Sequence, residues 1–244
     1  MVKEIPNDKL VVKPPTMLCD DVISNSIPEP LSKTSFVYLI VGSKGQGKSS
    51  LMTSIVTEKK KPFKAYRGKF DEIILNMPKS SAASIKGNPF GSLPKENIIG
   101  NFDEKLLQHI YETAEERSAE GEYTLAIIDD ASAKLKSNKA IIDGLTQLVH
   151  KHRHLRLSLM ILVQDLVSVP LGIRKNADAI FYFRPTNEKA NIIFREEFLG
   201  GFSKDETSKL MDDIFKKKGD FLMVKLSTAP FEYYRNFNRI ILEE

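Results

Sequence analysis

At residues 36–49 the chain reads FVYLIVGSKGQGKS. Its first six residues are apolar or aromatic and include β-branched side chains, which is typical of a short strand buried on both faces of a sheet. A glycine-rich turn begins at Gly42, and the residues from Ser49 to Thr57 have a helical pattern. A buried strand, a glycine-rich turn and a helix in this order predict a phosphate-binding loop in an α/β protein.

The loop has Walker A spacing, in which four residues separate Gly42 from Gly47-Lys48-Ser49. Glycine lets the backbone turn and bring its N–H groups to phosphate oxygens. The Lys48 ammonium suits the β- and γ-phosphates, and the Ser49 hydroxyl suits magnesium. We therefore expect ATP and Mg²⁺ as cofactors. The predicted nucleotide-binding residues are Gly42, Ser43, Lys44, Gly45, Gln46, Gly47, Lys48, Ser49 and Ser50.

Further apolar runs alternate with helical patterns along the chain. This alternation predicts a P-loop NTPase fold with a mostly parallel central sheet and helices on both faces. The expected strands are 36–41, 70–75, 123–128, 158–163, 179–183, 221–226 and 239–242. The expected helices are 49–57, 103–119, 141–152, 188–198 and 204–216.

We divide the chain into three parts. Residues 1–34 are rich in proline and predict an extended N-terminal arm, and residues 35–186 form the ATPase core. Residues 187–244 add helices and strands that complete or flank this core. Within the core, residues 78–100 contain several prolines and glycines, which predict a long surface loop.

Composition narrows the class of protein. The 244 residues are 41% hydrophobic and 28% charged, as in an ordinary globular domain. One cysteine excludes an internal disulfide, and no apolar run is long enough to span a membrane. No signal peptide is evident at the start, so we expect a cytosolic protein without a membrane partner. The net charge of +4 permits an acidic partner such as DNA but does not require one.

A second acidic motif follows the strand at 123–128. The run Leu125-Ala126-Ile127-Ile128-Asp129-Asp130 has the form of a Walker B motif, whose carboxylates meet the nucleotide at the end of a strand. Asp129 is expected to hold magnesium, and Asp130 to act as general base. The alternative is that the two aspartates only end the strand and begin a turn.

Two later residues are candidates for the same site. Gln164 ends the strand at 158–163 and could hydrogen-bond the γ-phosphate or the attacking water. Arg174 is expected on a surface turn, from which it could reach the nucleotide of an adjacent subunit. The alternatives are a polar residue that ends a strand and a solvated surface charge.

Together these motifs resemble the viral genome-packaging ATPases of the FtsK-HerA superfamily, the poxvirus-type enzymes of large DNA viruses and virophages. The resemblance covers residues 35–183, in the family's order. It implies a RecA/FtsK-HerA-like fold and an ATP-driven motor that moves double-stranded DNA into a preformed capsid. It also implies that Lys48, Asp130, Gln164 and Arg174 are catalytic and that Ser49 and Asp129 bind magnesium. Cellular members usually carry Glu where this chain has Asp130, which weakens the assignment of the base.

The family resemblance also implies partners and a location. We expect a pentameric or hexameric ring of this chain, double-stranded DNA and capsid vertex proteins as partners. The expected location is the cytoplasm of an infected host cell, at the viral factory or with the virion. A DNA channel needs basic side chains that contact phosphates. The candidates are Lys134, Lys136, Lys139, His152, Arg153 and Arg156; the runs at 59–61 and 216–218 are interpreted as solubilising turns.

Three other functions use the same motifs. A cellular-type DNA pump or helicase shares the superfamily and differs mainly in its substrate. A nucleoside kinase shares the loop, but kinases usually carry a mobile lid with arginines, and the loop at 78–100 contains none. A binding module without turnover would not need Lys48, Asp129, Asp130 and Gln164 together.

Overall fold

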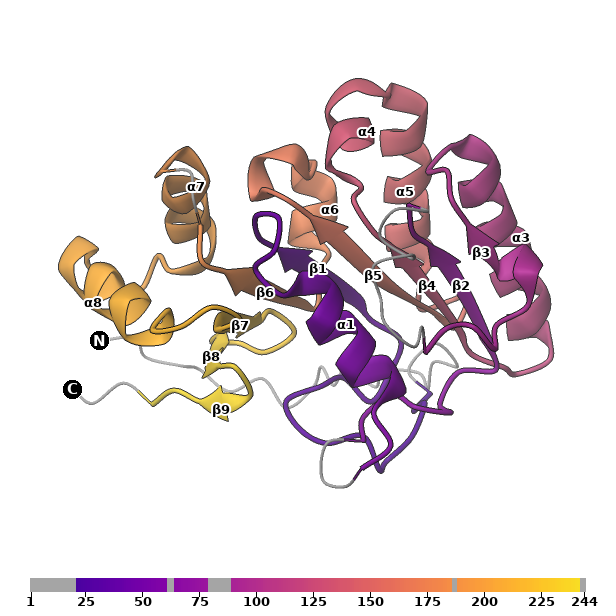
Figure 1. The fold of residues 1–244 in the computed structure, drawn as a ribbon, viewed down its shortest axis with the longest axis horizontal. Coiled ribbons are helices and arrows are strands. Elements are labelled where there is room, and N and C mark those ends of the chain that lie inside the picture. Colours follow the sequence, from indigo (N-terminus) through magenta and orange to yellow (C-terminus); the bar gives the residue numbers. More distant parts are fainter. Residues whose placement is uncertain (1–20, 61–63, 79–88, 186–187, 242–244) are drawn as a thin grey trace, which may run out of the picture.

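The computed structural model describes residues 21–60, 64–78, 89–185 and 188–241. Within them, one nine-stranded sheet runs through the molecule in the order β3-β2-β4-β5-β1-β6-β7-β8-β9 (Figure 1). The first six strands in this order are parallel, and the last three are antiparallel. The strands are β1 (Val37–Val41), β2 (Glu72–Asn76), β3 (Ile98–Ile99), β4 (Thr124–Ile128), β5 (Leu157–Val163), β6 (Ala179–Phe183), β7 (Phe221–Lys225), β8 (Glu232–Arg235) and β9 (Asn238–Arg239).

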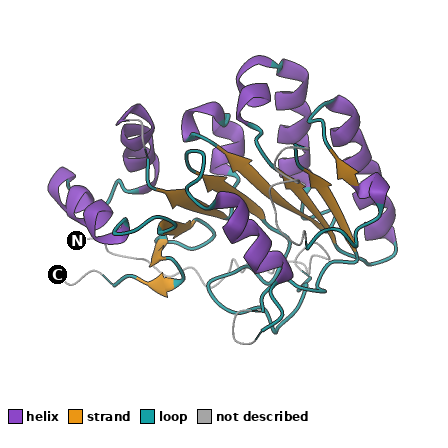
Figure 2. Cartoon of the chain, viewed as in Figure 1, coloured by secondary structure: helices purple, strands orange, loops and turns teal. Residues whose placement is uncertain are grey.

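Helices cover both faces of this sheet (Figures 1 and 2). α1 lies on one face, and α3, α4, α5 and α6 lie on the other, as expected for right-handed crossovers between parallel strands. The α-helices are α1 (Lys48–Thr57), α3 (Glu104–Ala119), α4 (Ser132–Ser137), α5 (Lys139–Lys151), α6 (Leu171–Lys175), α7 (Glu188–Phe198) and α8 (Lys204–Ile214). The 3₁₀ turns are η2 (Lys95–Asn97) and η3 (Leu166–Ser168).

β1 separates two hydrophobic cores. Its side chains alternate between them because successive residues of a strand point to opposite faces. Val37, Leu39 and Val41 join the core beneath α3 and α5, whereas Tyr38 and Ile40 join the core beneath α1. All five are almost completely buried, which confirms the prediction of a strand covered on both faces.

Residues 21–34 of the predicted N-terminal arm pack on the α1 side of the sheet. Ile27 and Leu31 are buried there, and the Tyr38 hydroxyl accepts a hydrogen bond of 2.6 Å from the Ser32 amide. This part of the arm therefore contributes to the core. The first 20 residues of the arm lie outside the described residues.

The C-terminal part continues the same sheet beyond β6. β7 pairs with β6 from Phe183↔Phe221 to Ala179↔Lys225, and β8 and β9 follow as an antiparallel meander. β8 and the short β3 were not among the expected strands. β3 lies inside the stretch 78–100 that was predicted to be a loop, of which residues 79–88 lie outside the described residues.

Candidate nucleotide-binding site

Strand order brings the predicted motifs to one edge of the sheet. β4, β5 and β1 are parallel neighbours, so their carboxyl ends lie side by side. The glycine-rich loop follows β1, Asp129 follows β4, and Gln164 follows β5. Ligands of open parallel sheets bind at this edge. The fold therefore gathers groups that are more than 120 residues apart in the sequence.

Three glycines shape the loop in different ways. Gly45 and Gly47 have φ values of 78° and 113°, which side-chain-bearing residues rarely adopt. At position 42 a side chain is excluded by a steric clash, because a Cβ atom there would lie 2.6 Å from the Phe183 Cβ on β6. Gly47 is also the N-cap of α1, whose free amides and dipole favour an anion.

The Lys48 side chain folds over the loop. Its Nζ donates hydrogen bonds to the carbonyl oxygens of Gly42, at 2.6 Å, and Ser43, at 3.3 Å. Burial lowers the pKa of the ammonium, while the charges of Asp129 and Asp130 oppose this shift. The cation is thus held between the start of the loop and the Walker B carboxylates.

Ser49 and Asp129 form the predicted pair of magnesium ligands. The Ser49 hydroxyl donates to the Asp129 Oδ2 across 3.4 Å, and Asp129 is 7% exposed. Burial raises the pKa of this carboxyl, and the positive charge of Lys48 opposes the shift. Hydroxyl and carboxylate oxygens suit Mg²⁺, which commonly takes one or two protein ligands, phosphate oxygens and water. The described residues contain no cluster of three or more His, Cys, Asp or Glu side chains that could hold a metal ion.

Asp130 and Gln164 meet beside this pair. The Gln164 Nε2 donates to the Asp130 Oδ1 at 2.8 Å, and the Gln164 amide donates to the Ser132 Oγ at 2.7 Å. Asp130 has a φ of 60° and is exposed, unlike its buried neighbour Asp129. The two adjacent carboxylates therefore have different surroundings, one enclosed near Ser49 and one open to solvent and bonded to an amide.

A pocket of about 720 Å³ lies over the loop. The predicted residues that line it are Gly45, Gln46, Gly47, Lys48, Ser49 and Ser50. The rest of its wall was not predicted and consists of Leu51, Ser54, Phe183, Lys218, Gly219 and Phe221. Lys218 and Gly219 come from the loop between α8 and β7, a basic run that the sequence interpretation treated as a solubilising turn. Only tertiary structure brings that loop to the pocket, so no local pattern marks it.

Arg174 does not have the surface position expected from the sequence. It lies in α6, and its guanidinium side chain is 11% exposed. Nε and Nη2 donate to the two carboxylate oxygens of Glu197 on α7, at 2.9 and 2.6 Å. Nη1 donates to the carbonyl oxygens of Leu166 and Val169. Within this chain the Arg174 side chain therefore joins α6, η3 and α7.

The two predicted basic clusters lie at opposite edges of the sheet. Lys134, Lys136 and Lys139 are exposed on and beside α4, which follows β4 at the nucleotide edge. The Lys136 Nζ forms an ion pair of 2.9 Å with Asp165, the residue after Gln164. This first cluster is therefore connected to the site.

The second cluster precedes β5, at the opposite edge. His152 is buried, with Nδ1 2.7 Å from the Val149 carbonyl oxygen, and burial lowers its pKa. Arg153 pairs with Asp178 at 3.4 Å, and Arg156 pairs with Asp21. Of the three predicted DNA-binding residues in this cluster, His152 is enclosed, Arg153 is exposed and Arg156 is half-buried.

No helix in the described part of the chain is long and apolar enough to cross a membrane. No protein-family model and no curated protein gives a significant match to the sequence.

Solved structures do match the fold. The DNA-packaging ATPase B204 of Sulfolobus turreted icosahedral virus has a TM-score of 0.57 at 16% identity, over 82% of this chain and 97% of that chain. B204 of Sulfolobus turreted icosahedral virus 2, in complex with ATP-γS, has a TM-score of 0.57 at 17% identity, over 85% and 98% of the two chains. EssC (ATPases 2 and 3) from Geobacillus thermodenitrificans has a TM-score of 0.56 at 14% identity, over 78% of this chain and 37% of that chain. The chain therefore has the α/β P-loop fold of the viral B204 packaging ATPases, as its motifs predict.

Proposed function

We propose that this chain is an ATPase that uses the energy of hydrolysis to move double-stranded DNA into a viral capsid. The observation that carries the proposal is the contact between Ser49 and Asp129, 3.4 Å apart beside Lys48 and the Asp130–Gln164 pair. A binding loop alone needs no carboxylate at its metal position and no second carboxylate beside it. Hydrolysis needs a carboxylate near magnesium and a group that activates or orients water, and Asp129 and the Asp130–Gln164 pair supply them. The shared fold of the B204 packaging ATPases supports DNA as the cargo.

Each site residue has a different role in the proposed hydrolysis. Lys48 and the loop amides hold the phosphates, and bound Mg²⁺, held by Ser49 and Asp129, would neutralise charge on the β- and γ-phosphates. Asp130 accepts a proton from water as the water oxygen attacks the γ-phosphorus and the bond to ADP breaks. Gln164, whose Nε2 is 2.8 Å from Asp130, orients this carboxylate and the water.

DNA contact is assigned to the lysines around α4. Lys134, Lys136 and Lys139 are exposed beside the proposed nucleotide site, whereas the second basic cluster lies at the opposite edge of the sheet. The ion pair between Lys136 and Asp165 gives a physical route from the γ-phosphate to DNA, because Gln164 and Asp165 are adjacent. A change at Gln164 would shift Asp165 and with it the lysine.

Ring assembly and a capsid partner complete the proposal. The motor acts as a pentameric or hexameric ring in the cytoplasm of the infected cell and docks on vertex proteins of the capsid. A role of Arg174 at a neighbouring subunit's nucleotide requires that its ion pair with Glu197 opens in the ring. A DNA pump with another destination would use the same chemistry and would differ in its docking partner.

The test is ATP hydrolysis with and without double-stranded DNA, together with the mass of the protein in ATP. We expect DNA to stimulate phosphate release, and we expect a ring to form with nucleotide. Lys48→Ala should reduce hydrolysis by about 100-fold or more, because the phosphates lose their main cation. The exposed Lys105→Ala on α3 serves as the control and should leave hydrolysis unchanged.

Two results would contradict this function. Hydrolysis that ignores DNA at every length and salt concentration would exclude the motor. Transfer of phosphate to an added nucleoside, in place of release to water, would identify a kinase instead.

A further inference from the structure

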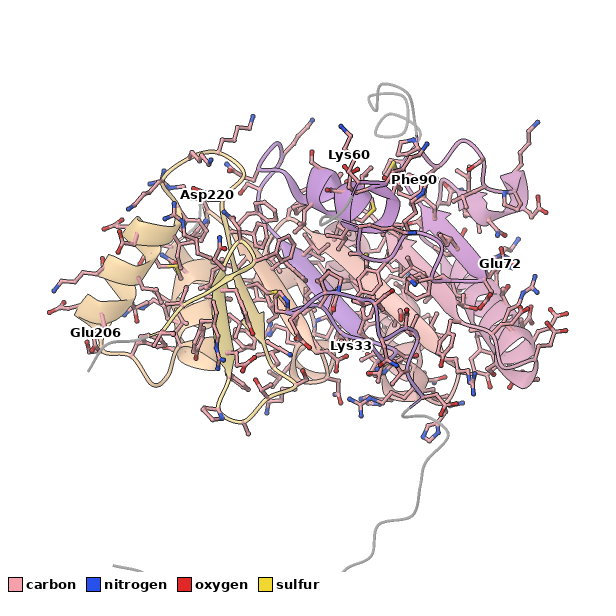
Figure 3. The ribbon with its side chains drawn as sticks, turned by 90° about the horizontal axis from the view of Figure 1, so that it is seen from below. Lys33, Lys60, Glu72, Phe90, Glu206 and Asp220 are labelled. Carbon is pink, nitrogen blue, oxygen red and sulfur yellow. The ribbon has the colours of Figure 1, made fainter. Side chains whose placement is uncertain are left out.

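The loop between α8 and β7 forms part of the nucleotide pocket although it lies far beyond the glycine-rich loop in the sequence. Lys218 and Gly219 of this loop line the pocket together with Gly47 and Ser50. In Figure 1 the loop reaches the N-terminal end of α1, and Figure 3 labels Asp220 at its base. The wall opposite α1 therefore comes from the C-terminal part of the chain.

The approach of the two loops is close. The Gly219 Cα would lie 3.6 Å from a Cβ atom placed on Gly47, so the gap between the two backbones has room for about one methyl group. In loops of this type the backbone amides hold the α- and β-phosphates, whereas the loop lysine reaches the β- and γ-phosphates. Gly47 adjoins Lys48 in the loop, and Lys218 adjoins Gly219. This places Lys218 beside the part of the pocket for the α- and β-phosphates.

Hydrogen bonds fix the conformation of the α8–β7 loop. Asp220 is 3% exposed, and its carboxylate accepts hydrogen bonds from the Lys217 amide, at 3.0 Å, and the Asn236 Nδ2, at 3.3 Å. Arg235 lies 3.7 Å from the same carboxylate. Gly219, with a φ of 94°, permits the turn. The position of Lys218 is thus set by a buried anchor.

The three lysines of the run differ in their surroundings. Lys216 pairs with Asp213 at 3.0 Å. All three lysines are exposed, and Lys217 is not part of the pocket wall. Lys218 lines the pocket, and no described residue forms an ion pair with it. A cation without a carboxylate partner, held beside a phosphate-binding loop, is suited to an anionic ligand.

We propose that Lys218 is a second phosphate-binding cation, which contacts the α- and β-phosphates of the nucleotide held by its own subunit. The inference rests on the proposed binding of ATP and adds a residue to it. Lys48 then acts at the γ-phosphate and its bond to the β-phosphate, where charge changes during hydrolysis, and Lys218 acts on phosphate oxygens away from the bond that breaks. Lys218 therefore contributes to binding ATP and ADP alike and adds little to the chemical step.

The test compares Lys218→Ala with Lys217→Ala, a matched control that removes the same charge from the same loop. Dissociation constants for ATP and ADP are measured by calorimetry at fixed salt, and kcat and KM are measured with ATP. Lys218→Ala should weaken both nucleotides by about tenfold and raise KM by about the same factor, with kcat nearly unchanged. Lys218→Arg should keep most of the affinity, and Lys217→Ala should resemble the unmodified protein.

Other results would overturn the assignment in distinct ways. Equal affinities in Lys218→Ala and Lys217→Ala would exclude the contact, even if the unmodified protein binds and hydrolyses ATP. Weakened ATP binding with unchanged ADP binding would move the contact to the γ-phosphate. An unmodified protein that binds neither nucleotide would overturn the proposed function and, with it, the role of Lys218.

Discussion

Asp129 is a site residue whose surroundings disfavour the ionised carboxylate. Its carboxyl group is buried beside Ser49, and burial raises its pKa despite the nearby charge of Lys48. Burial disfavours the charged form of this carboxyl, and a bound Mg²⁺ would offset that cost. Such a carboxylate is suited to bind Mg²⁺ together with nucleotide. The same property makes it a source of instability when neither ligand is bound.

Asp129→Asn should therefore stabilise the protein while it abolishes hydrolysis. Because the native pKa exceeds the unfolded value, the unmodified protein loses stability as pH rises through the interval between them. Asn keeps the shape but never ionises. Without Mg²⁺ and nucleotide, we expect the melting temperature at pH 7.5 to rise by about 2–4 °C.

The difference in melting temperature between Asp129→Asn and the unmodified protein should shrink as the pH is lowered to 4, because the raised pKa of Asp129 favours the protonated carboxyl in the folded protein. Thermal unfolding at both pH values checks the sign. If Asp129→Asn raised the melting temperature less at pH 7.5 than at pH 4, the raised pKa of Asp129 would be contradicted. Asp130→Asn, at the exposed neighbour, is the control.

Some site residues could be predicted from the sequence and others could not. The glycine-rich loop, Asp129 and Gln164 each follow a buried strand directly, so local pattern and strand order place them together. Lys218 reaches the pocket through a loop fixed by Asp220, a tertiary contact without a local pattern. Arg174 looked like a surface charge because its partner Glu197 lies 23 residues away on α7.

α4 is the element that joins the nucleotide edge to the proposed DNA surface. It begins at Ser132, whose Oγ accepts from the Gln164 amide, and it carries Lys136, which pairs with Asp165. Lys134 and Lys139 are exposed on and next to it. The first turn of α4 therefore contacts Gln164, and positively charged side chains are exposed toward its C-terminal end.

Lys134→Glu with Lys139→Glu should weaken binding to double-stranded DNA uniformly across sequences, because these residues meet phosphates and not bases. The slope of log K against the logarithm of the salt concentration should become less steep by about 2, because two lysines no longer neutralise one phosphate each. Fluorescence anisotropy over a range of salt concentrations measures both effects. ATP hydrolysis without DNA should not change.

Lys105→Glu with Lys209→Glu, on α3 and α8, is the matched control for charge reversal. If this control weakens DNA binding as much as the α4 variant, the effect is one of net charge and the α4 surface is wrong.

The elements themselves show where sequence pattern is sufficient. The long buried strands β1, β4, β5 and β6 were predicted within two residues because continuous apolar runs leave few alternatives. β3 has only two residues, Ile98–Ile99, within a stretch rich in proline and glycine. β8 consists of Glu232–Arg235, whose two central tyrosines lie between charged residues. Both strands depend on pairing with a neighbour, which a local pattern does not contain.

At the scale of the whole molecule, the question is whether Arg174 serves its own subunit or the next. The bidentate contact with Glu197 and the bonds to two carbonyl oxygens join α6, η3 and α7. These elements lie on the same side of the sheet as the core that contains Ile173 and Phe194. The subunit alone thus gives Arg174 a structural role.

Arg174→Ala should lower the free energy of unfolding of the isolated subunit by about 2 kcal/mol, because Glu197 loses its partner. A double-mutant cycle with Glu197→Gln should show coupling between the two residues, measured by urea unfolding. Lys175→Ala, at the exposed neighbour, should have almost no effect. Unchanged stability together with lost hydrolysis in ATP-bound rings would instead support a role at the neighbouring subunit.

The position of β1 has a consequence for biogenesis. The strands on either side of β1 are β5 and β6, which are both synthesised after it, and Phe36 and Ser158 are 122 positions apart. Until the ribosome has passed β6, the nascent glycine-rich loop has no sheet to hold it. The wall at Lys218 is synthesised later still. The pocket over the glycine-rich loop is therefore complete only after the chain has been synthesised as far as β7.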